Sequence, residues 1–445
     1  MRVFKDQQFK KRFLHLLFPI FVQEVLVVLI NTISSFIIGA VNQDALSGCN
    51  IANNVFLIFN TVLVGVAVTG SVFAAQYRGK NDEQAITKVF NFVLKLSIIW
   101  ALIFTVISTT IPSQIINIFA PANPKIIEFG STYLRFFSIS FIFRAISAMY
   151  FYSAKNLGKT KIIIIDSTIS LLLNTILCTL FVFVFNLSSL GAALSLTISR
   201  FVEMCIIIVY MHKFKEVRIN FKHFFKTDKK IRSEIIRYVL PIFGARIAWS
   251  VGAIMSALVL GRLNRDIIAA SSIITVCRDI IICFNVATSS ATDILLGQEL
   301  GAKKFELASK HGDDIMRCGL MVGCANMFTF MALCGIFFLI GQNILTPEAK
   351  DFLWKMMLIY LISIIPQTYN GVCHDGIFCA GGDKKFVLFN NLLPMWLITV
   401  PLGFISLFLK WPPLVTFFLI MSDEIAKFPT LLIHYYKRKW VKSIV

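Results

Sequence analysis

Long, continuous apolar runs recur along the whole of this 445-residue sequence. Each run covers about 20 residues with few charges, which is the length that an α-helix needs to cross the hydrocarbon core of a bilayer. Lipid offers no hydrogen bonds to the backbone, so only helices or a closed barrel can cross it, and barrel strands are short and alternate apolar with polar residues. The sequence therefore predicts an all-α membrane protein.

The runs predict twelve transmembrane helices, at 14–40, 50–76, 89–111, 130–152, 162–185, 190–211, 236–260, 267–297, 314–340, 352–376, 386–409 and 413–435. The connectors alternate in charge: one set, which includes both chain ends, carries 29 Lys and Arg, and the other carries five. Because basic loops stay inside, we expect a multi-pass protein of a bacterial-type cell membrane with both termini in the cytoplasm. The formal net charge of +19 then reflects topology, and we expect no nucleic-acid partner.

An internal repeat relates the two halves of the sequence. Pro19-Ile20-Phe21 recurs as Pro241-Ile242-Phe243. The same spacing takes Gly39 to Gly261, Asn42 to Asn264, Asp44 to Asp266, Gln76 to Gln298 and Gly79 to Gly301. These matches predict a duplicated six-helix unit. We predict an N-terminal lobe at 1–210, a basic cytoplasmic loop at 211–234 and a C-terminal lobe at 235–445, with a substrate site between the lobes near the midplane.

The repeat residues, together with the stretch AAQYRGKND at 74–82, resemble the multidrug and toxic compound extrusion (MATE) family. NLGKT at 156–160, GGDK at 381–384 and PLG at 401–403 are similar to that family too. The resemblance covers essentially the whole chain. It implies two six-helix lobes in a V that alternate between inward-facing and outward-facing states, and export of drug-like or metabolic organic solutes by antiport with H⁺ or Na⁺.

The coupling residues of the family do not carry over. Many members have an Asp five residues before the Gly of the first helix, whereas this sequence has Ser34 there and Ser256 at the repeat position. The coupling ion and the charge of the substrate are therefore open. The partners we expect are the bilayer and a small organic solute, with no cofactor besides the transported ion, and the protein is expected to function as a monomer.

Ionisable side chains inside apolar runs are functional candidates because charge is costly at membrane depth. Glu24, Asn31 and Ser35 share one face of the first helix at i, i+7 and i+11. Glu24 is either a proton or cation carrier or a structural ion-pair partner, and its repeat position is Arg246. Asp166 and Asn174 on the fifth helix complete the candidates for ion or proton coupling.

The candidates for the substrate cavity lie on the seventh and eighth helices: Arg246, Arg278, Asp279, Asn285 and Asp293. The arginines can bind an anionic group bidentately. Alternatively, Glu24, Asp279 or Asp293 neutralises them. Arg200 and Glu203, at i, i+3, are interpreted as a structural pair, and His374-Asp375 as a solvated helix end. No His pair at metal-binding spacing and no nucleophile–base motif occurs, so neither a metal site nor a catalytic site is expected.

Two other functions compete with export. A flippase for lipid-linked saccharides would share the two-lobe plan, and Arg246 and Arg278 leave that interpretation open, whereas a count of twelve helices favours the exporter. A membrane-embedded transferase, more distant, would need carboxylates or histidines clustered at an interface, and the external loops are short and poor in acids.

Overall fold

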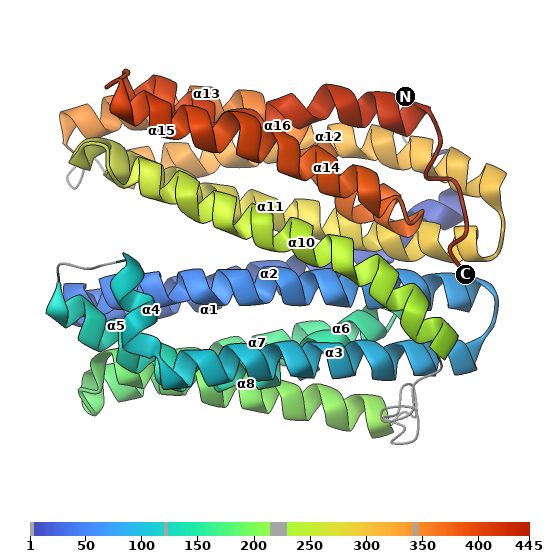
Figure 1. Ribbon diagram of the computed structural model, residues 1–445, viewed down its shortest axis with the longest axis horizontal. Coiled ribbons are helices and arrows are strands. Elements are labelled where there is room, and N and C mark those ends of the chain that lie inside the picture. Colours follow the sequence, from blue (N-terminus) through green and yellow to red (C-terminus); the bar gives the residue numbers. More distant parts are fainter. Residues whose placement is uncertain (1–3, 120–122, 214–228, 341–345) are drawn as a thin grey trace. The chain divides into compact units, whose positions relative to one another are not determined.

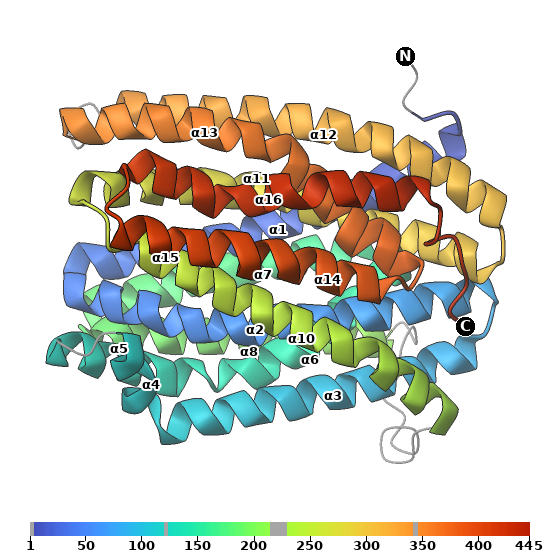
Figure 2. The same ribbon diagram turned by 45° about the horizontal axis from the view of Figure 1, so that its top comes forward.

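The computed structural model describes residues 4–119, 123–213, 229–340 and 346–445, and all regular structure in these ranges is helical (Figures 1 and 2). The first half contains α1 (Gln7–Val41), α2 (Gln43–Gly79), α3 (Glu83–Thr110), α4 (Pro112–Phe119), α5 (Pro124–Phe137), α6 (Ser140–Asn156), α7 (Thr160–Thr179) with the π-helical η1 (Leu180–Val184), and α8 (Ser188–Lys213). The second half contains α10 (Lys229–Leu260), α11 (Arg265–Gly301), α12 (Phe305–Ile340), α13 (Pro347–Gly371), η3 (Val372–Phe378), α14 (Lys384–Pro394), η4 (Met395–Thr399), α15 (Val400–Phe408) and α16 (Pro413–Tyr436).

Among the described residues, ten helices are long and apolar enough to cross a membrane. The pair α5 and α6, bent by 47° at its break, passes the same test when its two helices are counted together, which makes up to eleven spans. The helix that remains is α16, which carries Asp423, Glu424 and Lys427 near its middle. With α16 the helices match the twelve that the sequence predicted, which confirms the all-α membrane fold. The predicted loop at 211–234 falls mostly on residues 214–228, which lie outside the described residues.

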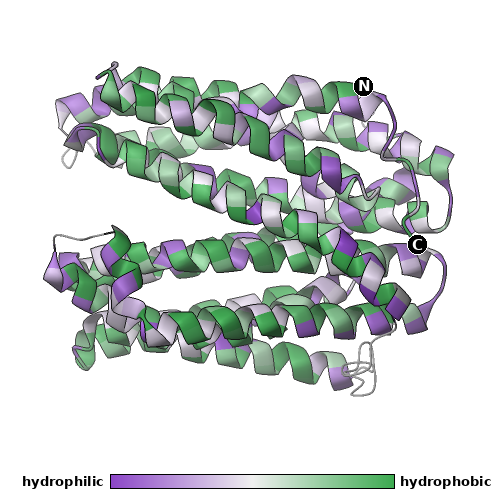
Figure 3. Ribbon diagram, in the orientation of Figure 1, coloured by the Kyte–Doolittle hydropathy of each residue, from purple (hydrophilic) through white to green (hydrophobic). Residues whose placement is uncertain are grey.

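Hydrophobic residues run along the lengths of these helices, and hydrophilic residues gather toward several of their ends (Figure 3). Large apolar side chains are extensively exposed: Phe36, Phe328 and Phe408 show 74%, 72% and 87% of their surface. In water, exposed apolar surface of this kind would promote aggregation, whereas in a bilayer such residues face acyl chains. The exposed apolar surface therefore agrees with a helical protein embedded in lipid.

The internal repeat is visible in the local geometry. Helices α2 and α11 each contain 37 residues, and both their first and their last residues are related by the spacing of the sequence repeat. Asn42 caps α2 by accepting from the amide of Ala45, and Asn264 caps α11 by accepting from the amide of Ile267. An Asn side chain at this position satisfies an amide that the first helical turn leaves without a partner. The equivalent caps show the same local geometry at positions that the sequence repeat relates, as a duplication predicts.

The chain packs as two compact units, Val22–Val239 in one, and Met1–Phe21 with Leu240–Val445 in the other. Helices α1 and α10 each contribute to both, and each changes unit beside its proline, Pro19 or Pro241. These limits follow packing, whereas the lobe limits that we predict from the sequence follow the repeat. The predicted lobe limits of 1–210 and 235–445 therefore stay a prediction.

Each unit has its own set of helix contacts. In Val22–Val239, α2 packs against α3, α5 and α6, and α8 packs against α5, α6 and α7. In the other unit, α11 packs against α12, α13 and η3, and α13 also packs against α16. The start of α1 joins this second set, because Phe9, Phe13 and Ile20 belong to the apolar core that contains Leu296, Phe378 and Trp440.

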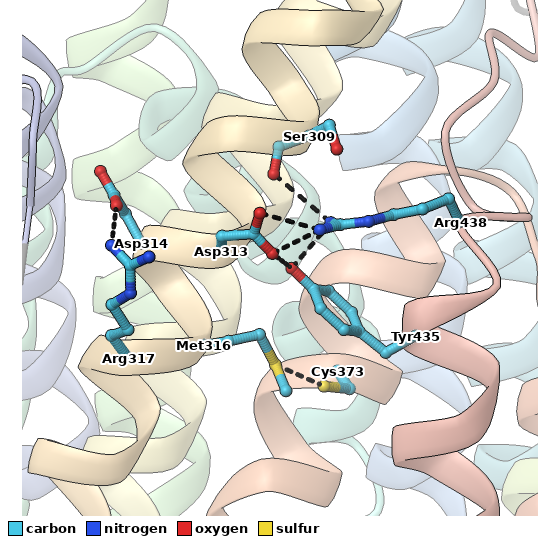
Figure 4. A network of polar contacts seen from close by, with 8 residues as sticks. All are labelled: Ser309, Asp313, Asp314, Met316, Arg317, Cys373, Tyr435 and Arg438. Carbon is cyan, nitrogen blue, oxygen red and sulfur yellow. Dashed lines mark hydrogen bonds and ion pairs between the residues drawn. The ribbon is translucent and has the colours of Figure 1, made fainter.

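Polar contacts fasten the C-terminal tail to the same core (Figure 4). The Arg438 guanidinium donates to both Asp313 oxygens, at 2.6 and 2.8 Å, and Tyr435 donates to Asp313 at 2.7 Å. Burial lowers the pKa of Arg438, but its hydrogen bonds and charge contact with Asp313 outweigh burial and leave that pKa raised. Just beyond, Trp440 is fully buried against Gly312 and Gly381. A side chain at Gly381 would overlap the Trp440 backbone, so the glycine permits this close packing.

Candidate functional site

Asp166, in the first half of α7, is fully buried. Neither of its carboxylate oxygens has a hydrogen-bond partner among the described residues. Moving an ionised carboxylate from water into a buried position without hydrogen-bond donors costs several kcal/mol of folding free energy. A carboxylate that binds a proton or another cation would have these two properties, full burial and the lack of a donor. Asp166 therefore stays a candidate for ion coupling.

Beside Asp166 lies a buried acid that is fully satisfied. Glu203 on α8 accepts from the guanidinium of Arg200 at 2.7 Å, and Arg144 on α6 lies 3.5 Å away. Ser147 and Ser170 also donate to Glu203, at 3.2 and 3.4 Å. The predicted Arg200–Glu203 pair is confirmed, but the sequence did not indicate Arg144. Arg144 lies in the fourth predicted span and Glu203 in the sixth, and the distance between them in the sequence does not indicate that they are in contact.

Glu24 on α1 is paired with a lysine. Its carboxylate lies 3.6 Å from the Lys155 ammonium, and Lys155 is almost completely buried on α6. The sequence offered Arg246 as the structural partner of Glu24, whereas the cation that the structure places beside it is Lys155. The two residues that share its predicted face differ in exposure: Asn31 is exposed and Ser35 half-buried.

Neutral groups occupy the position where many family members have an acid. Asn174 on α7 donates to the hydroxyl of Ser34 on α1 at 2.8 Å, and both side chains are buried. Asp166 lies eight residues before Asn174, which is about 12 Å along a helix. The buried acid of α7 is therefore about two turns away from the Ser34–Asn174 pair.

The candidates in the unit containing Leu240–Val445 are divided among three separate contacts. The Arg246 guanidinium donates to Asp375 at 2.5 Å, and Arg278 lies 3.4 Å from Asp279. The Asn285 side chain accepts from Asn326 at 2.9 Å, and Asn326 also donates to Thr368. Asp293 is buried. Of the neutralising partners that the sequence offered, the structure pairs Asp279 with Arg278, whereas Arg246 takes Asp375.

The interpretation of His374-Asp375 as a solvated helix end is wrong for His374. His374 is buried, and its Nε2 accepts from the carboxamide of Asn390 at 2.9 Å. Asp375 forms the ion pair with Arg246. Hydropathy placed both residues near a span boundary, but the helical path continues through η3, where His374 is buried and the Asp375 side chain stays 39% exposed.

Three charges of α16 were also missed by the sequence analysis. Lys427 contacts Asp423 and Glu424. All three lie in a span that was predicted from its apolar residues alone. Their i, i+3 and i, i+4 spacing was the available indication. Among the described residues, no group of three or more His, Cys, Asp or Glu side chains is arranged to hold a metal ion.

Comparisons with known proteins agree with this architecture. The MatE family model matches residues 19–180 and 241–405, which covers most of the chain in two copies that begin at Pro19 and Pro241. The chain therefore belongs to the MatE family of MATE transporters, as its motifs suggested, and it is a membrane transporter. The two matches start at the same pair of prolines that opens the sequence repeat, so they independently confirm it.

Individual relatives are distant but extend over nearly the full length. The chain is 25% identical over 415 residues to a probable multidrug resistance protein NorM of Bacillus cereus, covering 90% of this chain and 89% of that protein. A crystal structure of a mutant of the Vibrio cholerae MATE transporter VcmN has a TM-score of 0.85 at 14% identity, over 97% of each chain. A MOP superfamily transporter from Pyrococcus furiosus, described as having a binding pocket of reverse polarity, has a TM-score of 0.82 at 16% identity, over 98% of each chain. These structural likenesses show the shared fold.

Proposed function

We propose that this transporter exports drug-like or metabolic organic solutes in exchange for protons, and that Asp166 binds the proton. The observation that carries the proposal is the full burial of Asp166 with no hydrogen-bond partner for either oxygen among the described residues. The names of relatives such as NorM support a multidrug type of cargo for those proteins, and we extend it to this chain.

Coupling follows from the charge of a small cluster. Asp166 interacts electrostatically with nearby charged groups, chiefly Glu203 and Arg200. Arg144 contacts the same Glu203. With Asp166 ionised the two acids balance the two arginines, and with Asp166 protonated the cluster carries one net positive charge. A buried change of one unit charge stabilises two conformations differently, because a conformation that exposes the cluster to water favours the charged state. Proton uptake and release can thereby drive alternation.

Protons suit Asp166 better than sodium. Hard metal cations such as Ca²⁺ are held by several oxygen ligands, and we expect the same of Na⁺. Asp166, in contrast, is a single carboxylate, and the acid that acts on it, Glu203, already contacts two arginines. A proton needs only one oxygen. Glu24 is the second coupling candidate, with its proton competing against Lys155 for the carboxylate.

The test is transport of ethidium, a drug-like cation, in proteoliposomes with an imposed pH gradient. We expect Asp166→Asn to lose gradient-driven ethidium movement while binding ethidium within about threefold of wild type, a difference below about 1 kcal/mol. Asp351→Asn is the matched control, because Asp351 is an exposed acid paired with Lys355. Undiminished pH-driven transport by Asp166→Asn would refute the role of Asp166. Transport driven by a sodium gradient without a pH gradient would refute the choice of ion.

A flippase of lipid-linked saccharides is the second candidate, because one arginine has a hydrogen-bond donor without a partner among the described residues. The Nε of Arg278 is buried and has no hydrogen-bond partner among the described residues. Arginine binds phosphate groups with a fork of such donors. If Arg278→Gln weakens binding of a pyrophosphate-linked lipid tenfold and leaves ethidium binding unchanged, the flippase is favoured over the exporter.

We also propose that the protein acts as a monomer with both termini in the cytoplasm. The basic residues of the chain ends and of alternate connectors support this orientation. Each six-helix copy holds its own buried polar cluster, so the function proposed above needs no residue from a second chain.

A further inference from the structure

A lysine lies buried in the middle of α16. Only 1% of the Lys427 side chain is exposed. Its ammonium donates to Asp423 at 2.6 Å and lies 3.5 Å from a Glu424 oxygen, so two carboxylates of the same helix face one cation. An ammonium buried at this depth is tolerated only with such close counter-charges, because its own desolvation is expensive.

A second helix completes the surroundings of the acids. Asn370 on α13 donates to the Glu424 side chain at 2.7 Å and to its backbone carbonyl at 2.8 Å. The carbonyl oxygen of the same Asn370 side chain is buried without a hydrogen-bond partner among the described residues. Asn370 is only 3% exposed, so the donor that holds Glu424 is itself buried. Asn370 therefore fixes the position of Glu424 from a second helix.

The neighbouring histidine, His374, contacts Asn390. Asn390 donates to Nε2 of His374 at 2.9 Å, and Thr430 donates to Asn390 at 2.6 Å. The Nε2 atom of His374 is therefore engaged with Asn390 rather than with an acid of α16. The ammonium of Lys427 is therefore the cation that the two acids of α16 share.

We infer that Asp423 and Glu424, the latter held in place by Asn370, form a binding site for a primary ammonium group, and that the chain fills this site with its own Lys427. A fully apolar α16 would cross the membrane at lower cost, so stability alone does not explain three charges in its middle. Because the ammonium is covalently attached, this unit retains its cation throughout the transport cycle. On the proposed function above, proton exchange is then left to the unit that contains Asp166.

The test removes the lysine side chain and so empties the proposed ammonium site. Lys427→Ala removes three carbons and the ammonium, which n-propylammonium matches atom for atom. In the purified full-length protein, we expect Lys427→Ala to unfold at a lower temperature than wild type. Saturating n-propylammonium should raise that midpoint by about 5 °C, since a ligand that binds only the folded state stabilises it. The wild-type midpoint should move by less than about 1 °C, because its site is filled.

The controls separate this site from general salt effects. Lys355→Ala removes a lysine with the same i, i+4 geometry and the same 2.6 Å contact, to Asp351, but at an exposed position. This variant should not respond to n-propylammonium, and n-propanol, which lacks the charge, should not stabilise Lys427→Ala. The charge-free variant Asp423→Asn, Glu424→Gln, Lys427→Met should fold without the amine and ignore it.

Equal responses of Lys427→Ala and Lys355→Ala, or equal rescue by n-propanol, would overturn the inference. If Lys427→Ala alone does not fold, the same titration on Lys427→Ala, Glu424→Gln decides, because that variant keeps one acid. The readout uses no ion gradient. A negative result here therefore leaves the Asp166 proposal intact, and failure of Asp166→Asn to alter transport leaves the ammonium site intact.

Discussion

Replacing Glu203 by Gln should be among the more damaging single changes to the segment Val22–Val239. Glu203 is 2% exposed and is the acid that contacts both Arg200 and Arg144. Its loss leaves two buried guanidinium groups that contact no acid among the described residues, because Asp166 makes no hydrogen bond to either of them. Removing one partner of a buried ion pair costs about 3–5 kcal/mol, so we expect a loss in this range. For a unit of this size, that corresponds to a fall in the unfolding midpoint of about 10 °C.

The partner variants predict an order of stability. Arg200→Gln leaves Glu203 with Arg144 at 3.5 Å, so charge balance within the trio improves and the loss should be smaller. The double variant Glu203→Gln, Arg200→Gln restores the net charge of the native trio, and it should recover part of the loss. A thiol-reactive dye can follow unfolding in detergent, because all ten cysteines are free and eight of them are buried. If Arg200→Gln is as damaging as Glu203→Gln, or if the double variant is the least stable, the electrostatic reasoning is wrong.

Two further predictions concern packing and topology. Gly48→Ala should destabilise by about 1–3 kcal/mol through overpacking, since a methyl group there would lie 2.6 Å from the Gly130 amide nitrogen; Gly335→Ala, which meets nothing within 4 Å, should be neutral or stabilising in the same dye assay. A reporter enzyme fused after Val445 should be active on the cytoplasmic side, and activity outside would contradict the charge-based orientation.

Features with local causes could be predicted from the sequence. Apolar length indicated the helices, and the Asn at 42 and 264 begins a helix because its own side chain caps the third amide that follows. The repeat was readable because Pro, Gly and Gln recur at positions that apolar bias does not explain. Asp166 and Asn174 were also identifiable as polar residues inside an apolar run, since that property needs no knowledge of neighbours.

The partners of the buried charges could not be predicted in the same way. Glu24 meets Lys155, and Arg246 meets Asp375, across separations in the sequence at which only packing decides which residues are adjacent. The sequence could propose Arg246 for Glu24 from repeat symmetry, but symmetry relates positions and does not bring them into contact. Lys427 was missed because a span is recognised by its mean hydropathy, and three charges confined to two turns change that mean little.

The grouping of Met1–Phe21 with Leu240–Val445 has a consequence for biosynthesis. Phe9, Phe13 and Ile20 leave the ribosome first, yet the core that buries them contains Leu296, Phe378 and Trp440. At a synthesis rate of about 5–20 residues per second, about 10–40 s pass before the first residue after Val239 is made. During that interval the start of α1 has none of these partners, so assembly of this core must follow the completion of the chain rather than its beginning.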